Sequence, residues 1–113
     1  MSNFLYLFWN KPVDKPPSPE QMERLTKVWM TWMDDLRKSG HLVKPGERLD
    51  RSGKVVRGKA KVVTDGPYAE AKDTIGGYVI VQAKDIDEAV EVSKGCPIFD
   101  SDGMVEVRSI VSM

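Results

Sequence analysis

Residues 4–9, Phe-Leu-Tyr-Leu-Phe-Trp, form the apolar run that most limits how this chain can fold. Six residues are far too few to cross a bilayer, which takes about 20, but they suit a short strand rich in aromatic side chains. Successive side chains of a strand point to opposite faces of its sheet. Aromatic rings would line one face and mostly aliphatic groups the other: Phe4, Tyr6 and Phe8 against Leu5, Leu7 and Trp9. Because both faces are apolar, we expect a central strand that is covered on both sides.

Length and charge narrow the class of protein. The chain of 113 residues is near the commonest domain size, so we expect a single domain over residues 1–113. Lys and Arg number 17, as do Asp and Glu, so bulk charge gives no sign of a polyanion partner. A lone cysteine, Cys96, and a lone histidine, His41, exclude a zinc finger. We expect a cytoplasmic protein without a membrane span, and no motif predicts a bound metal or cofactor.

One long helix has clear start and stop signals. Ser18, Pro19 and Gln21 together predict a capping box at its beginning. Apolar side chains then recur at spacings of three and four residues and form one stripe: Met22, Leu25, Trp29, Trp32 and Leu36. Gly40 predicts the end of this helix in a left-handed conformation.

The remaining elements complete a recognisable order. Asp85 with Glu88 predicts a second, shorter helix that ends at about residue 94. Strands are expected at residues 41–43, 54–57, 61–64, 75–83 and 105–111. The order β-α-β-hairpin-β-α-β is that of the ferredoxin-like βαββαβ plan with an extra hairpin. The chain is therefore assigned to the α+β class, with one antiparallel sheet, both helices on a single face, and strands 4–9 and 75–83 at its centre.

The second face of such a sheet needs a cover, because large bare apolar patches are uncommon on monomers. A second copy, a ligand or a nucleic acid could each provide it. An RNA-binding sheet needs aromatic residues that stack on bases. Here Tyr78 is followed by Val79 and Ile80, and no Lys or Arg precedes Gly77. We therefore expect a symmetric homodimer rather than a nucleic-acid partner.

Residues 44–61 are rich in positive charge, with seven basic residues and two acidic ones. This pattern is compatible with an anion-binding patch. It is also typical of a solvated hairpin whose charged edges prevent aggregation. Because basic runs alone are weak evidence for binding, we favour the solvated hairpin.

Residues 64–72, Thr-Asp-Gly-Pro-Tyr-Ala-Glu-Ala-Lys, are the most distinctive stretch of the chain. Together with Gly-Gly-Tyr at 76–78, Gly-Cys-Pro at 95–97 and Val-Glu-Val-Arg at 105–108, they closely resemble the YCII-related family, also called the DGPF-domain family. The resemblance extends over residues 5–110. The chain departs from the family name at Tyr68, where a phenylalanine is usual; the ring is kept and a hydroxyl is added.

The resemblance implies a dimeric α+β barrel, in which two ferredoxin-like sheets pack face to face. It also implies a cleft with a His–Asp pair that has been suggested as a catalytic site. Relatives in the wider superfamily include muconolactone isomerases, chloromuconolactone dehalogenases and small cofactor-free monooxygenases, and some family members are joined to sigma factors. The resemblance thus predicts the fold in more detail than the function.

His41 and Asp65 are the residues to which the resemblance points as a catalytic pair. His41 would begin a strand directly after the helix stop, and imidazole can exchange protons near neutral pH. Asp65 would orient and charge it, although an Asp at the head of a turn also commonly binds its own backbone. Tyr68, Glu70 and Gly76 are candidate substrate-binding residues. In an antiparallel sheet the start of one strand can lie beside the end of another, so we expect His41 and Asp65 to meet.

Two functional classes stay open. The first is a cofactor-free enzyme that performs acid–base chemistry, such as isomerisation or elimination, on a small organic molecule. The second is a ligand-binding or transcription-accessory module without turnover. A His41–Asp65 pair would favour the enzyme, whereas a His41 engaged elsewhere would favour the binding module. Cys96 is expected to be a small apolar filler rather than a nucleophile.

Overall fold

The computed structural model describes residues 1–12, 15–66 and 73–112. In chain order the elements are β1 (Ser2–Asn10), α1 (Pro19–Lys38), β2 (Leu42–Lys44), β3 (Gly53–Arg57), β4 (Val62–Gly66), β5 (Thr74–Ala83), α2 (Ile86–Ser93), a short 3-10 helix η1 (Pro97–Ser101) and β6 (Met104–Ser109). β1, β5, β2 and β6 form one sheet in the order β2-β5-β1-β6, and every neighbouring pair is antiparallel. This is the predicted ferredoxin-like arrangement, with β1 and β5 at the centre.

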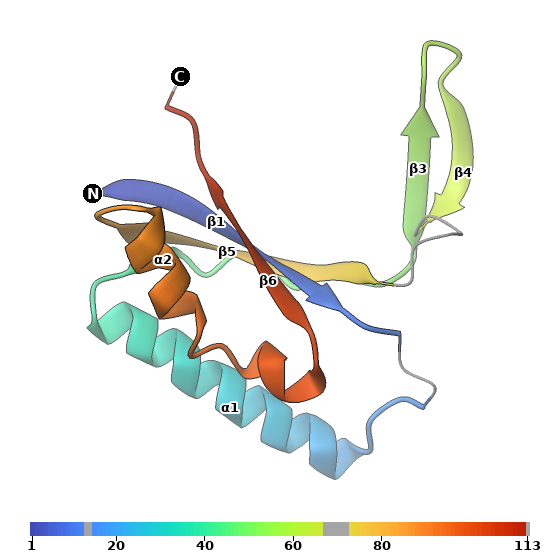
Figure 1. The fold of residues 1–113 in the computed structure, drawn as a ribbon. Coiled ribbons are helices and arrows are strands. Elements are labelled where there is room, and N and C mark those ends of the chain that lie inside the picture. The colour runs from blue at the N-terminus through green and yellow to red at the C-terminus, as the bar shows by residue number, and fades with distance from the viewer. Residues whose placement is uncertain (13–14, 67–72, 113) are drawn as a thin grey trace.

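Both helices lie on the same side of the sheet, below the strands in Figure 1. On that side the alternate residues Phe4, Tyr6 and Phe8 of β1 are buried, as the strand pattern predicts. The ring of Tyr6 stacks on Trp32 of α1, and Phe8 contacts Trp29 and Trp32 edge to face, with the ring centroids of Phe8 and Trp29 5.1 Å apart. The hydrophobic core therefore lies between the sheet and its helices.

The residues predicted to begin and end the helices do so in the structure. Ser18 Oγ accepts from the Gln21 backbone N–H at 3.1 Å, and Gln21 Oε1 accepts from the Ser18 N–H at 2.9 Å, which completes the capping box of α1. Gly40 follows the helix with a φ of +82°. The side chain of Asp85 accepts from the Glu88 N–H and caps α2. No helix in the described part of the chain is both long enough and apolar enough to span a bilayer.

Two adjacent glycines shape β5. Phe8 pairs with Gly77 and Trp9 with Ile75, so Gly76 between them is the extra residue of a β-bulge. A side chain at Gly76 would overlap with the Asn10 amide. At Gly77 a Cβ would lie 2.9 Å from the Glu47 carbonyl oxygen, because residues 47–49 run close alongside β5.

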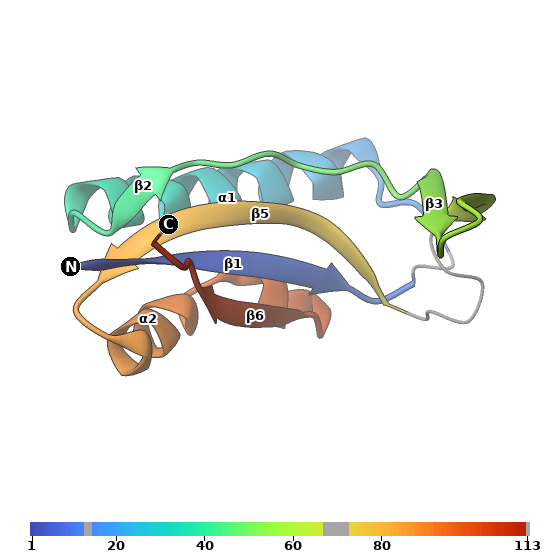
Figure 2. The same ribbon diagram turned by 90° about the horizontal axis from the view of Figure 1, so that it is seen from above.

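β3 and β4 form a separate two-stranded sheet, which with its turn (residues 53–66) we call the arm. The arm rises from the body on the side opposite the helices, at the end where β5 begins (Figures 1 and 2). With the arm included, the molecule measures 43 × 43 × 19 Å along its principal axes. The predicted hairpin is confirmed.

Candidate functional site

The sheet face away from the helices, which we call the open face, is largely apolar. Its central part is formed by partly exposed side chains that are neighbours across β1 and β5: Leu5 beside Ile80, and Leu7 beside Tyr78. At one end Trp9 Nε1 donates a hydrogen bond of 2.9 Å to Glu106 of β6. The open face therefore has an apolar centre and polar groups at its margin.

His41 lies at the edge of the sheet, between the end of α1 and the start of β2. Its backbone N–H donates to the Leu36 carbonyl at 3.0 Å, and its carbonyl accepts from the Gln82 N–H at 2.7 Å. The ring atom Nδ1 is 2.9 Å from the Gln82 carbonyl oxygen. Because a carbonyl oxygen can only accept, Nδ1 must carry the proton of this hydrogen bond. In the neutral ring, Nε2 is then the proton acceptor.

Asp65 lies on the arm. In the β3–β4 register it is directly opposite Lys54, and its carboxylate forms an ion pair with the Lys54 ammonium. The Asp65 side chain is 85% exposed, so water screens this pair and its contribution to stability is small. The ion pair nevertheless gives the carboxylate a partner near the base of the arm.

His41 and Asp65 of the same chain do not lie together. His41 is bonded to Gln82, whereas the segment that leads into the arm meets β5 at Gly76, where the Leu49 N–H donates to the Gly76 carbonyl. Six residues of strand separate Gly76 from Gln82, a distance of about 20 Å at ~3.3 Å per residue. The expected convergence within a chain fails because β4 pairs with β3 in a sheet of its own instead of joining the main sheet.

The other candidate residues have different outcomes. Tyr68 and Glu70 lie outside the described residues. Gly76 is described, and its place in the β5 bulge puts it near the base of the arm rather than near His41. A role for Gly76 in substrate binding stays a prediction.

Cys96 is buried against the core. Burial raises the pKa of its thiol to about 12, so the thiol stays protonated at neutral pH. This agrees with the expected apolar filler, because the thiolate is the nucleophilic form. Over residues 1–12, 15–66 and 73–112, no three His, Cys, Asp or Glu side chains come together in a way that could hold a metal ion.

The sequence model of the YCII-related domain matches residues 4–113, nearly the whole chain. The chain belongs to the YCII-related domain family. No curated protein matches it. This YCII-related domain therefore consists of a ferredoxin-like fold with an added arm.

The sequence analysis of this YCII-related domain missed two residues, Gln82 and Lys54, which bind the side chains of His41 and Asp65. Gln82 binds the His41 ring through its backbone carbonyl, and no sequence signal marks a carbonyl for this role. Lys54 could have been found, because a hairpin that turns at residues 58–61 pairs position 54 with position 65. The first contact depends on tertiary structure, and the second only on hairpin register.

Proposed function

We propose that the protein is a homodimer in which His41 acts as a general base on a small organic molecule without a cofactor. The hydrogen bond from His41 Nδ1 to the Gln82 carbonyl carries this proposal, because it holds the ring in one tautomer and leaves Nε2 as the proton acceptor. Such a base removes a proton from carbon. If the proton returns at another position, the reaction is an isomerisation; if a leaving group departs, it is an elimination.

The open face supports the dimer. A twofold contact places the same patch on both sides, so the patch must be complementary to itself. The apolar centre formed by Leu5, Leu7 and Ile80 suits such a contact. Glu106 and Arg108 lie on the same strand, β6, have opposite charges, and are 3.9 Å apart in an ion pair within the chain. Each can therefore face its counterpart across a twofold axis.

The test begins with a metabolite panel, scored by the rise in melting temperature, because stabilisation reports binding without a guessed assay. Each stabilising compound is then incubated with the protein in deuterated buffer and followed by proton NMR. We expect at least one to exchange a proton for deuterium or to be converted. His41→Gln keeps an N–H donor for the Gln82 carbonyl but lacks a basic ring nitrogen, so the compound should still bind and no longer react.

A ligand-binding module without turnover is the second candidate. It is favoured by the position of Asp65, which is paired with Lys54 and far from His41 in the same chain, so that one chain lacks the charged partner of the predicted pair. Compounds that stabilise the wild type and His41→Gln equally, and stay unchanged with both, would favour this module over the enzyme.

A further inference from the structure

We propose that the arm of one copy lies beside His41 of the other copy, so that the candidate site is built by two chains. The proposal rests on the homodimer proposed above and adds how the two copies are oriented. It assigns Asp65 of one copy and His41 of the other to the same site. Four properties of the described residues support it: the arm's lack of support, its direction, its charge and the position of Asp65.

Within the described part of the chain, the other helices and strands give the arm little support. Among the described elements, β3 and β4 make extensive contacts only with each other. A two-stranded hairpin is marginally stable at best in water. The arm also exposes valines: Val56 is 63% exposed, Val62 55% and Val63 59%. Val56 and Val63 are direct cross-strand neighbours on one face of the arm, so a partner could cover both at once.

The arm points toward the place that a second copy would occupy. It rises on the same side of the body as the open face (Figures 1 and 2). Five residues of strand extend for about 17 Å, whereas sheets that pack face to face are about 10 Å apart. A copy seated on the open face would therefore have the arm against one of its ends, and the arm is long enough to pass the edge of that copy's sheet.

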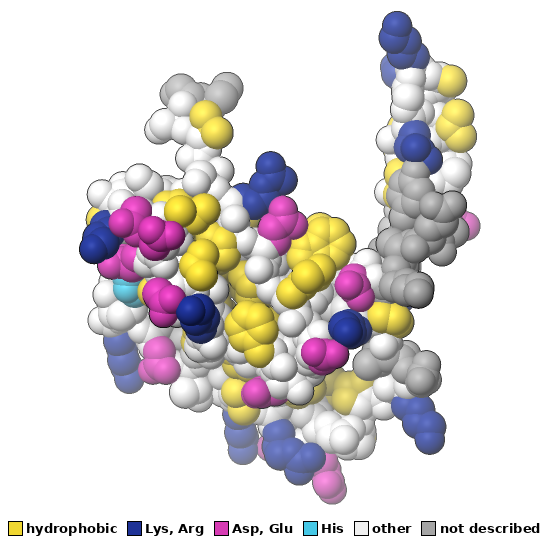
Figure 3. Space-filling view, in the orientation of Figure 1, with side chains coloured by type: hydrophobic (Ala, Val, Ile, Leu, Met, Phe, Trp, Pro, Cys, Tyr) yellow, Lys and Arg dark blue, Asp and Glu magenta, His cyan; other side chains and the backbone are white. Residues whose placement is uncertain are grey.

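Charge favours one of two ways to seat the second copy. If the twofold axis ran along the strands, both arms would lie at the same end; if it ran across them, the arms would lie at opposite ends. The arm contains four basic residues and one acidic residue, a net charge of +3: Lys54, Arg57, Lys59 and Lys61 against Asp65. Because the whole chain is neutral, the rest carries −3. Opposite ends separate the two positive arms and place each against a negative body; Figure 3 shows the basic and apolar side chains of the arm.

An axis across the strands exchanges the two ends of β5. The end of one copy with Gln82 and His41 then lies over the Gly76 end of the other, where the arm begins. Asp65 is the second-last residue of β4 and thus lies near the base of the arm, at the level between the two sheets. Its carboxylate would reach the partner copy's imidazole and stabilise the ring when it takes up a proton. Two chains would thereby form the pair that one chain does not.

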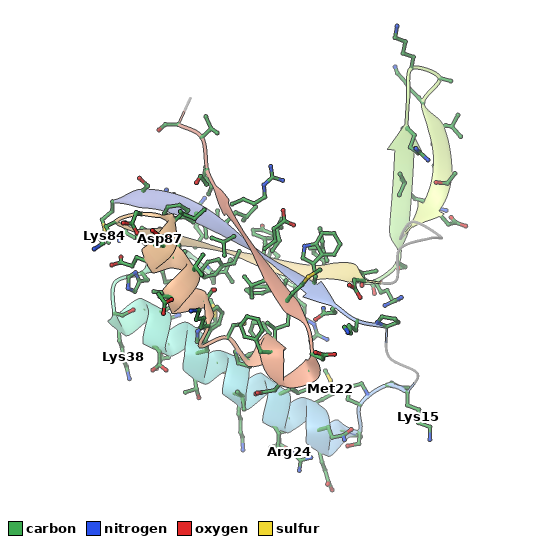
Figure 4. The ribbon with its side chains drawn as sticks, in the orientation of Figure 1. Lys15, Met22, Arg24, Lys38, Lys84 and Asp87 are labelled. Carbon is green, nitrogen blue, oxygen red and sulfur yellow. The ribbon has the colours of Figure 1, made fainter. Side chains whose placement is uncertain are left out.

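Cysteine cross-linking tests this arrangement. In a Cys96→Ser background, chains with Thr64→Cys on the arm are mixed with differently tagged chains that carry Lys84→Cys, which follows β5 at the end of the body away from the arm (Figure 4). A flexible bismaleimide should link the two kinds of chain. Arg24→Cys is the matched control. Arg24 lies near the beginning of α1, toward the opposite end of the body from Lys84, and should give no link to Thr64→Cys (Figure 4).

Every other outcome of the cross-linking and sedimentation experiments would refute a specific part of the proposal. Links between two Thr64→Cys chains, or between Thr64→Cys and Arg24→Cys, would put the arms at the same end and refute the proposal. A dimer by sedimentation without any link would leave the basic arm open to another occupant, such as a polyanion, and would refute the arm contact but not the homodimer. Sedimentation as a monomer would refute the homodimer itself.

Discussion

Tyr6 shows how much depends on a single buried hydroxyl. The side chain is completely buried, and its hydroxyl donates to the Ala89 carbonyl of α2. This bond ties the central strand to the second helix. Burial is the main cause that raises the pKa of Tyr6, and the nearby Cys96 adds to it. The folded protein therefore holds the Tyr6 proton more tightly than the unfolded chain does.

Tyr6→Phe should lower the free energy of unfolding by about 1 kcal/mol at pH 7, because the Ala89 carbonyl loses its donor. The variant's free energy of unfolding should also fall less than that of the wild type as the pH rises above 10. A raised folded-state pKa gives stability that is complete below the ordinary tyrosine value of about 10 and is lost as pH rises toward the folded value. Urea unfolding at pH 7 and above pH 10 measures both effects. Equal stability of the variant and the wild type at pH 7 would contradict the role of the hydrogen bond.

Cys96 should resist thiol reagents in the folded state. Its pKa of about 12 and its burial leave little thiolate at pH 8. Labelling with a chromogenic disulfide at pH 8 should be slow in buffer and fast in a denaturing concentration of urea. Rapid labelling of the folded protein would show that the thiol is accessible, and the filler assignment would be wrong.

At the scale of elements, local signals determine α1. Its capping box satisfies backbone groups that the first turn of a helix would otherwise leave without partners. Ser18→Ala should lower the free energy of unfolding by about 1 kcal/mol, and Ser18→Asp, which keeps an acceptor, should lower it much less. Urea unfolding of both variants measures this. Similar losses in the two would show that the side-chain acceptor is not what stabilises the helix start.

Gly46 and Gly58 have the same backbone conformation, so comparing their alanine variants separates the cost of backbone strain from the cost of a steric overlap. Gly46 and Gly58 both have a φ of +68°. A Cβ at Gly58 would meet nothing within 4 Å, whereas one at Gly46 would overlap with the Tyr78 carbonyl. Gly46→Ala should therefore cost at least about 1 kcal/mol more than Gly58→Ala, because close-packed groups do not yield freely. Equal losses would mean that the segment before the arm moves away from β5 without cost.

At the scale of the whole molecule, the open face is expected to hold two copies together. Leu7→Glu puts a charge at its centre and should convert a dimer to a monomer in sedimentation at micromolar concentration. Met30→Glu is the matched control, because Met30 is an exposed apolar residue of α1, on the other side of the sheet, and its variant should remain dimeric. A wild-type chain that sediments as a monomer would remove the dimer.

Local patterns were sufficient for most of the fold. The alternation in residues 4–9 predicts which side chains of β1 are buried, and the signals at Ser18, Gly40 and Asp85 predict the limits of the helices. These features depend on neighbours within a few residues, whose preferences the sequence states directly.

The sequence by itself determined the elements, their order and the ferredoxin-like sheet, because periodicity, caps and turns act over short distances. Only the tertiary structure decided where the candidate site residues lie. Whether β4 joins the main sheet or pairs with β3 alone depends on how distant strands compete for hydrogen bonds, and that choice puts Asp65 on the arm, far from His41 of the same chain. The contact of His41 with Gln82 joins residues 41 positions apart through a backbone carbonyl, a group that every residue has and that no sequence pattern can single out.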